Sequence, residues 1–175
     1  MPAVLPLPRA LIVFFWFLGT SLLTVWFVFT DPRFDYRLLL VGAVLPDLID
    51  IPTGGQARWA HSLTVAVGAL VAVMVVTAGR KPVRRLLLGL PIGMLLHLVF
   101  DATWASTEVF WWPFSGSWGD VDVMSLDRGW LNVPLEIAGL VMLVWAYRRF
   151  GLATTDGRTR FARHGLLADT RPPAV

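Results

Sequence analysis

Five acidic and histidine side chains stand within largely apolar parts of this sequence, at spacings that could build a metal site. His97 and Asp101 are four residues apart and Asp47 and Asp50 three apart, so each pair would share one helix face. His61 lies between the two pairs in the sequence. Imidazole nitrogens and carboxylate oxygens are ligands of Zn²⁺, Mn²⁺ and Fe. The set predicts a site for one or two divalent metal ions, zinc or manganese above all, which could activate water by lowering its pKa toward ~7.

Each of these residues also has a purely structural interpretation. A histidine near a helix end, such as His61, is often a packed residue, and His97 with Asp101 could be a hydrogen-bonded helix pair without a metal. Asp47 could cap a helix after Pro46, and Asp50 could serve the turn that follows. The metal interpretation therefore depends on all five side chains meeting at one place.

Their depth along the apolar segments favours such a meeting. Arg80 and Lys81 form a basic turn, and His61 and His97 lie on either side of it in the sequence. At the helical rise, the two histidines would stand roughly 28 Å and roughly 24 Å from that turn. Both imidazoles are thus expected near the opposite end of their segments, at similar height.

The composition is that of a membrane protein. Of the 175 residues, 56% are hydrophobic and only 15% are charged, whereas a soluble domain typically has about 25% charged residues. The mean hydropathy is +0.65. The absence of cysteine excludes disulfides and thiolate metal sites. The net charge of +3 is too concentrated near the C-terminus to favour nucleic-acid binding.

The apolar segments predict an all-α fold, a polytopic transmembrane helical bundle with four long spans and one short or re-entrant helix. The long spans are expected at Leu11–Phe29, Trp59–Ala78, Val83–Phe100 and Trp130–Tyr147. The short segment, Leu38–Ile51, is interrupted by Pro46 and Asp47. The membrane-embedded helical domain would comprise residues 1–150, and residues 151–175 would form a basic, poorly ordered tail.

The distribution of charge predicts the orientation in a plasma or bacterial inner membrane. The basic turn from Arg80 to Arg85 and the C-terminal tail should be cytoplasmic. The region from Asp101 to Glu136 contains six acidic residues and several tryptophans, so it should lie outside. Five spans would place the N-terminus outside, and four spans with a re-entrant segment would place it inside. In both cases the five candidate metal-binding side chains approach the outer face.

Three further residues have two interpretations each. Arg58 could snorkel to the interface or bind a phosphate. Trp104 could belong to an interfacial aromatic belt or form part of a substrate platform. Glu136, inside the last span, could have a functional role or could hydrogen-bond a neighbouring helix, and we prefer the second interpretation.

Four short motifs follow one another in an order that resembles the YdjM-like membrane-bound metal-dependent hydrolases. They are Gly42-Ala-Val-Leu-Pro-Asp-Leu-Ile-Asp50, Arg58-Trp-Ala-His61-Ser62, Gly93-Met-Leu-Leu-His97-Leu-Val-Phe-Asp101-Ala-Thr-Trp104, and Glu108-Val-Phe-Trp-Trp-Pro113-Phe. The resemblance covers roughly residues 38 to 115.

This resemblance implies metal-ligand roles for Asp47, Asp50, His61, His97 and Asp101. It also implies that Glu108, which precedes the Trp-Pro element, is a ligand or a general base, so that Glu108 and Asp50 are the candidate catalytic residues. Arg58 and Trp104 are the candidate substrate-binding residues. Many members of the family carry a further histidine where this sequence has Gln56, so one imidazole ligand is missing and a two-metal site is less favoured.

The function predicted from these observations is hydrolysis of a phosphoester or ester in a lipid or lipid-linked substrate at the outer membrane face. The alternative is a non-enzymatic membrane protein, either an assembly partner in a larger complex or a transporter. A transporter is disfavoured because the inner halves of the long spans lack ionisable residues. Association with another membrane protein, or with a second copy of the chain, is compatible with a hydrolase and with a non-enzymatic membrane protein.

Overall fold

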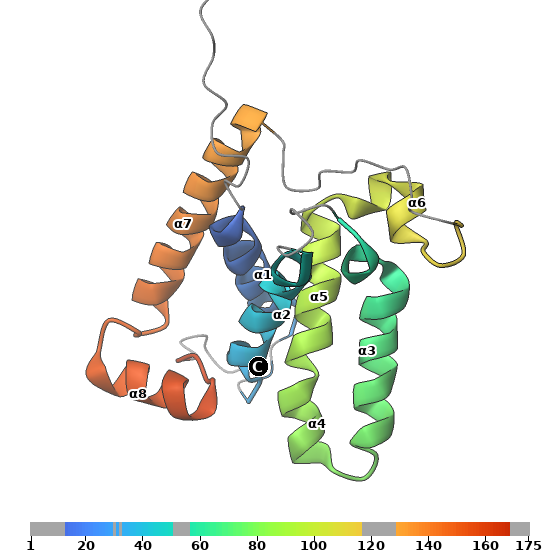
Figure 1. Ribbon diagram of the computed structural model, residues 1–175. Helices are drawn as coiled ribbons and strands as arrows, with labels where there is room; N and C mark the ends of the chain where they lie inside the picture. The colour runs from blue at the N-terminus through green and yellow to red at the C-terminus, as the bar shows by residue number, and fades with distance from the viewer. Residues whose placement is uncertain (1–12, 30, 32, 51–56, 117–128, 169–175) are drawn as a thin grey trace, which may run out of the picture.

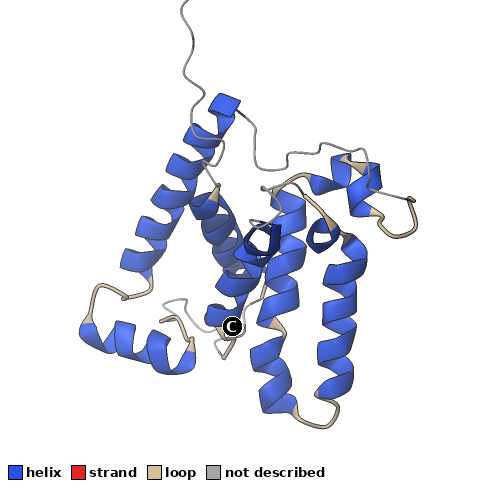
Figure 2. Ribbon diagram, viewed as in Figure 1, coloured by secondary structure: helices blue, strands red, loops and turns tan. Residues whose placement is uncertain are grey.

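The computed structural model describes residues 13–29, 31, 33–50, 57–116 and 129–168, and these parts of the chain are helical, with no strand among them (Figures 1 and 2). The helices are α1 (Phe14–Val28), α2 (Tyr36–Asp50), α3 (Leu63–Val76), α4 (Lys81–Leu87), α5 (Gly89–Phe100), α6 (Thr107–Phe110), α7 (Asn132–Arg149) and α8 (Thr155–His164). Short 3₁₀ turns join some of them: η2 (Trp59–His61), η3 (Thr103–Ala105) and η4 (Gly129–Leu131). The predicted all-α class is therefore confirmed.

One helix in the described parts of the chain is long and apolar enough to cross a membrane. It runs from Lys81 to Phe100, through α4 and α5, over 20 residues. A core helix of a soluble protein can have the same length and composition. The apolar helices Phe14–Val28 and Leu63–Val76 are shorter, and the predicted arrangement of four spans stays a prediction.

Helix α2 passes through Pro46 without ending there. The sequence predicted a short or re-entrant helix whose apolar run is broken at Pro46, and α2 has 15 residues, as many as α1. A proline inside a helix loses one hydrogen bond, and its ring crowds the carbonyl four residues earlier. That earlier residue is Gly42, and Pro46 itself is buried. Because the helix continues, Asp47 and Asp50 keep the common face expected from their spacing.

Helices α2 and α5 pack with their backbones in contact, as Figure 1 shows. A Cβ atom added at Gly42 would overlap the carbonyl oxygen of Leu90, and one added at Gly93 would overlap that of Leu39. Small residues at a helix interface permit this close approach. The approach matters for function because α2 carries Asp47 and α5 carries His97.

Helix α1 packs against α7 at a second close crossing, where Gly19 faces Gly139. Near this crossing the backbone N–H of Phe15 donates to Glu136 Oε1 over 2.9 Å. The first N–H groups of a helix have no partner within the helix and carry partial positive charge, so a carboxylate there is stabilising. Glu136 thus hydrogen-bonds a neighbouring helix, and the preferred interpretation is confirmed.

The expectation of a poorly ordered C-terminal tail is wrong for residues 151–168. Thr154 caps the first turn of α8 by accepting from the N–H of Gly157, and Gly165 ends the helix at φ +68°. The N–H of Tyr36 then donates to the carbonyl of Gly165 over 2.9 Å. Leu167 is buried in the same core cluster as Phe150. The cap at Thr154 and the burial of Leu167 stabilise this segment. The prediction of poor order rested on its polar, arginine-rich composition.

Candidate metal centre

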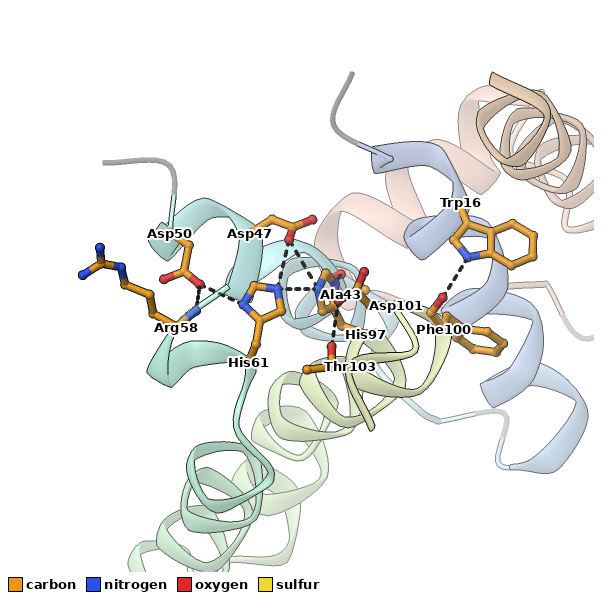
Figure 3. Close-up of polar contacts among 10 residues, drawn as sticks. All are labelled: Trp16, Ala43, Asp47, Asp50, Arg58, His61, His97, Phe100, Asp101 and Thr103. Atoms are coloured by element: carbon orange, nitrogen blue, oxygen red, sulfur yellow. Dashed lines mark hydrogen bonds and ion pairs between the residues drawn. The ribbon is translucent and has the colours of Figure 1, made fainter. Parts of the chain in front are cut away.

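Asp47, His61 and His97 bring three ligand atoms together at the C-terminal ends of α2 and α5 (Figure 3). His61 Nε2 lies 3.2 Å from Asp47 Oδ1, and His97 Nε2 lies 3.4 Å from the same oxygen. The two Nε2 atoms are 3.2 Å apart. Three elements distant in sequence, namely α2, η2 and α5, therefore supply one compact triangle of donors.

The three side chains are removed from solvent. His61 and His97 are each 0% exposed and Asp47 is 2% exposed. Burying ionisable groups is costly unless they are paired or bind a metal. The free-energy cost of burying these three side chains must therefore be offset by their mutual contacts or by a bound metal ion.

The other ring nitrogen of each histidine is already engaged. His97 Nδ1 lies 2.8 Å from the carbonyl oxygen of Ala43, and His61 Nδ1 lies 2.8 Å from Asp50 Oδ2. Both oxygens only accept, so each Nδ1 carries a proton and donates it. In the neutral imidazoles the proton-free atoms are then the two Nε2 atoms, which face each other. Two lone pairs at this separation repel unless a proton or a metal ion lies between them.

The second carboxylate oxygen of Asp47 lies outside this triangle. This Oδ2 atom is buried and has no hydrogen-bond partner among the residues that the structure describes. Buried carboxylate oxygens without a partner are rare, and a divalent ion bound at Asp47 would offset the charge of this carboxylate.

The separations in the triangle match those that a tetrahedral ion requires. Zn²⁺ with bonds of about 2.0–2.1 Å holds its ligand atoms about 3.3 Å apart, and catalytic zinc sites often use three protein ligands and keep one position open. The three measured separations are 3.2, 3.2 and 3.4 Å. The donor set and its geometry thus fit a single divalent ion held by Asp47, His61 and His97.

The turn that carries His61 is held in place by the next residue. Ser62 Oγ donates to the carbonyl of Trp59 over 2.8 Å and accepts from the N–H of Val65 over 3.2 Å. Ser62 is therefore the N-cap of α3, a position in which serine is preferred. This explains why a serine follows the histidine in the motif Arg58-Trp-Ala-His61-Ser62.

Asp50 occupies a supporting position and is not one of the three converging residues. Its Oδ2 accepts from His61 Nδ1 and also from the backbone N–H of Arg58 over 2.9 Å. A carboxylate on the outer nitrogen of a metal-binding histidine fixes the ring and raises its basicity. The sequence predicted a direct ligand and a catalytic residue here, whereas the structure places Asp50 behind His61.

Asp101 lies next to this group but is also outside the triangle. Thr103 Oγ1 donates to Asp101 Oδ2 over 2.7 Å, and the aspartate is 5% exposed. Burial raises the pKa of the Asp101 carboxyl above its ordinary value, although the nearby His97 and His61 and the bond from Thr103 act in the opposite direction. Of the five predicted ligands, three converge and two stand beside them.

The remaining site predictions fall on residues outside the triangle. The guanidinium of Arg58 points away from His61 in Figure 3. Trp104 is 60% exposed, and its Nε1 donates to the carbonyl of Val99. Glu108 is exposed on α6. The substrate-binding and proton-transfer roles of these residues stay predictions, and Gln56 lies outside the described residues.

Two contributors were not foreseen from the sequence. The carbonyl of Ala43 orients His97, and a backbone acceptor has no signal in the residue type. Thr103 holds Asp101, and its position two residues after the aspartate could have suggested a local hydrogen bond.

Replacing Asp50 by asparagine tests the supporting role. We expect Asp50→Asn to weaken metal affinity by about 10- to 100-fold, the usual effect of losing such a partner, while saturating metal still fills the site. Asp47→Asn, which removes a ligand, should prevent saturation. Zinc titration of the two purified variants with a competing chelator measures the difference. Equal loss in both variants would make Asp50 a ligand.

Comparisons of this chain with protein-family models, with curated proteins and with solved structures each returned no match. The resemblance to the YdjM-like hydrolases therefore stands on the four sequence motifs alone.

Proposed function

We propose that this chain is a membrane-bound, metal-dependent hydrolase acting on a phosphoester or ester of a lipid or lipid-linked substrate. One observation carries the proposal. Two histidines and an aspartate direct two Nε2 atoms and one carboxylate oxygen at a common point, and both Nδ1 atoms are held by acceptors. Two nitrogens and one oxygen are a donor set found in hydrolytic zinc enzymes.

Some residues of the site would bind the ion, and others would orient the binding residues. Asp47, His61 and His97 would hold the ion, Asp50 would keep the His61 ring in place, and the Ala43 carbonyl would do the same for His97. A divalent ion bound there supplies Lewis acidity and lowers the pKa of a coordinated water toward ~7. Burial of the three ligands strengthens each electrostatic interaction in the site.

The membrane setting is supported by apolar side chains on the outside of the bundle. On α3, Val71 is 54% exposed and Val75 is 67% exposed, and on α7, Val141 is 63% exposed. Large exposed apolar surfaces in a folded protein indicate contact with a membrane or with a partner. Together with the mean hydropathy of +0.65, they support the proposed bundle of four long spans and the short helix α2.

The position of the site supports a substrate at the membrane surface. His97 lies near the end of the helix Lys81–Phe100, and the basic residues Lys81 and Arg85 lie at its other end. By the positive-inside rule, the basic end would be cytoplasmic, so the metal site would approach the outer headgroups. A phosphoester or an acyl ester is the hydrolysable bond present at that depth.

Turnover by the purified chain tests the proposal. The full-length protein in an uncharged detergent would be supplied with Zn²⁺ or Mn²⁺ and assayed with bis(p-nitrophenyl) phosphate, p-nitrophenyl phosphate and p-nitrophenyl acetate. We expect hydrolysis of at least one ester, reduced at least about 100-fold in Asp47→Asn because a ligand is lost. Asp156→Asn removes an exposed carboxylate on α8 and should leave the rate unchanged. A metal-loaded chain that hydrolyses none of the esters, or an active Asp47→Asn variant, contradicts the proposal.

A further inference from the structure

A polar pocket lies at the end of the molecule where α4 and α8 are found (Figure 1). Its volume is about 230 Å³, and it is bordered by the segment before α2, the start of α4 and the end of α8. Its polar lining consists of four arginines, one histidine and one carboxylate: Arg33, Arg37, Arg85, Arg163, His164 and Asp35. Asp35 precedes α2, and Asp47 is near its other end, so the pocket is roughly 18 Å along the helix from the metal centre.

The single carboxylate of the pocket is already neutralised. Arg37 Nη2 lies 2.6 Å from Asp35 Oδ2, and Arg37 Nε donates to Asp35 Oδ1 over 3.0 Å. Arg37 Nη1 also donates to the carbonyl oxygens of Ala162 and Arg163 over 2.9 and 3.2 Å. Arg37 therefore fastens the end of α8 to the start of α2 and forms a wall of the pocket.

The other guanidinium groups are not neutralised in this way. Arg33 and Arg163 have no acidic side chain as partner among the described residues, and both are exposed. Arg85 Nε lies 3.5 Å from Asp31 Oδ2, with 46% and 44% of the two side chains exposed. Exposed pairs of this kind contribute little to stability. Arg33, Arg85 and Arg163 thus surround one small space with excess positive charge.

We infer that this pocket binds a phosphate-bearing anion. Guanidinium groups match the oxygens of phosphate in pairs of parallel hydrogen bonds, and several around one space favour a group with more than one acceptor oxygen. The pocket volume exceeds the roughly 30 Å³ that one water molecule occupies, so a phosphate group with its waters fits. Pro82 and Leu86 add an apolar wall for an organic part of the ligand.

The phosphate has two sources with the same chemistry, an anionic lipid headgroup and a free phosphate or pyrophosphate. Basic pockets between membrane helices on the cytoplasmic side bind lipid headgroups, and α4 lies at the end that the positive-inside rule places there. The inference does not depend on the proposed hydrolase activity, because none of the pocket residues belongs to the metal centre.

Binding measurements on the full-length protein test this inference. Isothermal titration in uncharged detergent would use inorganic phosphate and pyrophosphate. Thermophoresis would compare the binding of the protein to phosphatidylglycerol and to phosphatidylcholine, each supplied in nanodiscs. We expect saturable binding that falls at least tenfold in the double variant Arg33→Gln/Arg163→Gln. Binding of the free anions identifies a soluble source, and binding only in discs with phosphatidylglycerol identifies a lipid headgroup.

A matched double variant separates the pocket from general attraction to positive charge. Lys81→Gln/Arg160→Gln removes the same charge from α4 and α8, at exposed residues outside the pocket lining. It should bind within twofold of the unchanged chain, and circular dichroism should show both variants folded. Absence of saturable binding by the unchanged chain, or an equal loss in the two double variants, overturns the inference.

Discussion

Replacing His97 by alanine is expected to remove bound metal from the purified chain, while the same replacement at His164 leaves the metal content unchanged. His97 supplies one of the three ligand atoms that converge among the described residues, and His164 is exposed at the end of α8. These two and His61 are all the histidines of the chain, so the control differs in position and not in residue type. Two remaining protein ligands are fewer than the three of catalytic zinc sites.

The measurement is the metal content after incubation with excess zinc and desalting, by inductively coupled plasma mass spectrometry. We expect about one ion per chain in the unchanged protein and in His164→Ala, since the triangle fits one ion. His97→Ala should retain less than about a tenth of this, because even loss of a supporting partner costs about 10- to 100-fold in affinity. His61→Gln keeps a polar side chain at the second imidazole position and should show the same loss. Unchanged content in both variants, or an equal loss in His164→Ala, would refute the metal centre.

Replacing Gly93 by alanine is expected to destabilise the fold strongly, although alanine is the better helix former. The added Cβ would overlap the backbone of α2 at Leu39 and Ala43. Overpacking typically costs about 1–3 kcal/mol, and a collision with the backbone of α2, which cannot rotate away as a side chain could, places this variant near the upper value. Ala43 is also the residue whose carbonyl orients His97. Metal affinity should therefore fall together with stability.

Gly68 on α3 provides the matched control for this change. It has no neighbouring atom within 4 Å of an added Cβ among the described residues. Gly68→Ala should stabilise the chain by about 0.5–1 kcal/mol through helix propensity alone. Thermal unfolding in detergent, followed by circular dichroism, compares the two variants. If Gly93→Ala unfolds at the same temperature as the unchanged protein, the close α2–α5 contact is not what holds the site together.

Local sequence pattern was sufficient to place most of the helices. The run Leu11–Phe29 became α1, Trp59–Ala78 became η2 and α3, and Val83–Phe100 lies within α4 and α5. A long apolar run with few charges can form a helix that is apolar on all sides. The length of the run therefore gives the approximate length of the helix. The order of residues 151–168 was not predicted, because the composition of the tail is polar and arginine-rich. The cap at Thr154 and the buried side chain of Leu167 were not recognised in it.

The choice among the five site residues required coordinates. Spacing on a helix says which side chains share a face, and in this respect Asp47 and Asp50 are equivalent. They differ because η2 turns the His61 ring so that Nδ1 meets Asp50 and Nε2 meets Asp47. That turn depends on contacts of η2 with α2 and α3, which join separate elements and do not follow from spacing within one helix.

By itself, the sequence determined that the described parts of the chain are helical and that His61, His97 and the neighbouring aspartates stand near one end of the apolar segments. Residue type and period decide both, because they act within a single helix. The tertiary structure alone decided that Asp47, His61 and His97 form the triangle, that Asp50 stands behind it, and that four arginines surround a pocket at the other end. All three depend on how separate elements pack together. The close approach of α2 and α5, which brings Asp47 near His97, is permitted by glycines such as Gly42 and Gly93 acting across helices.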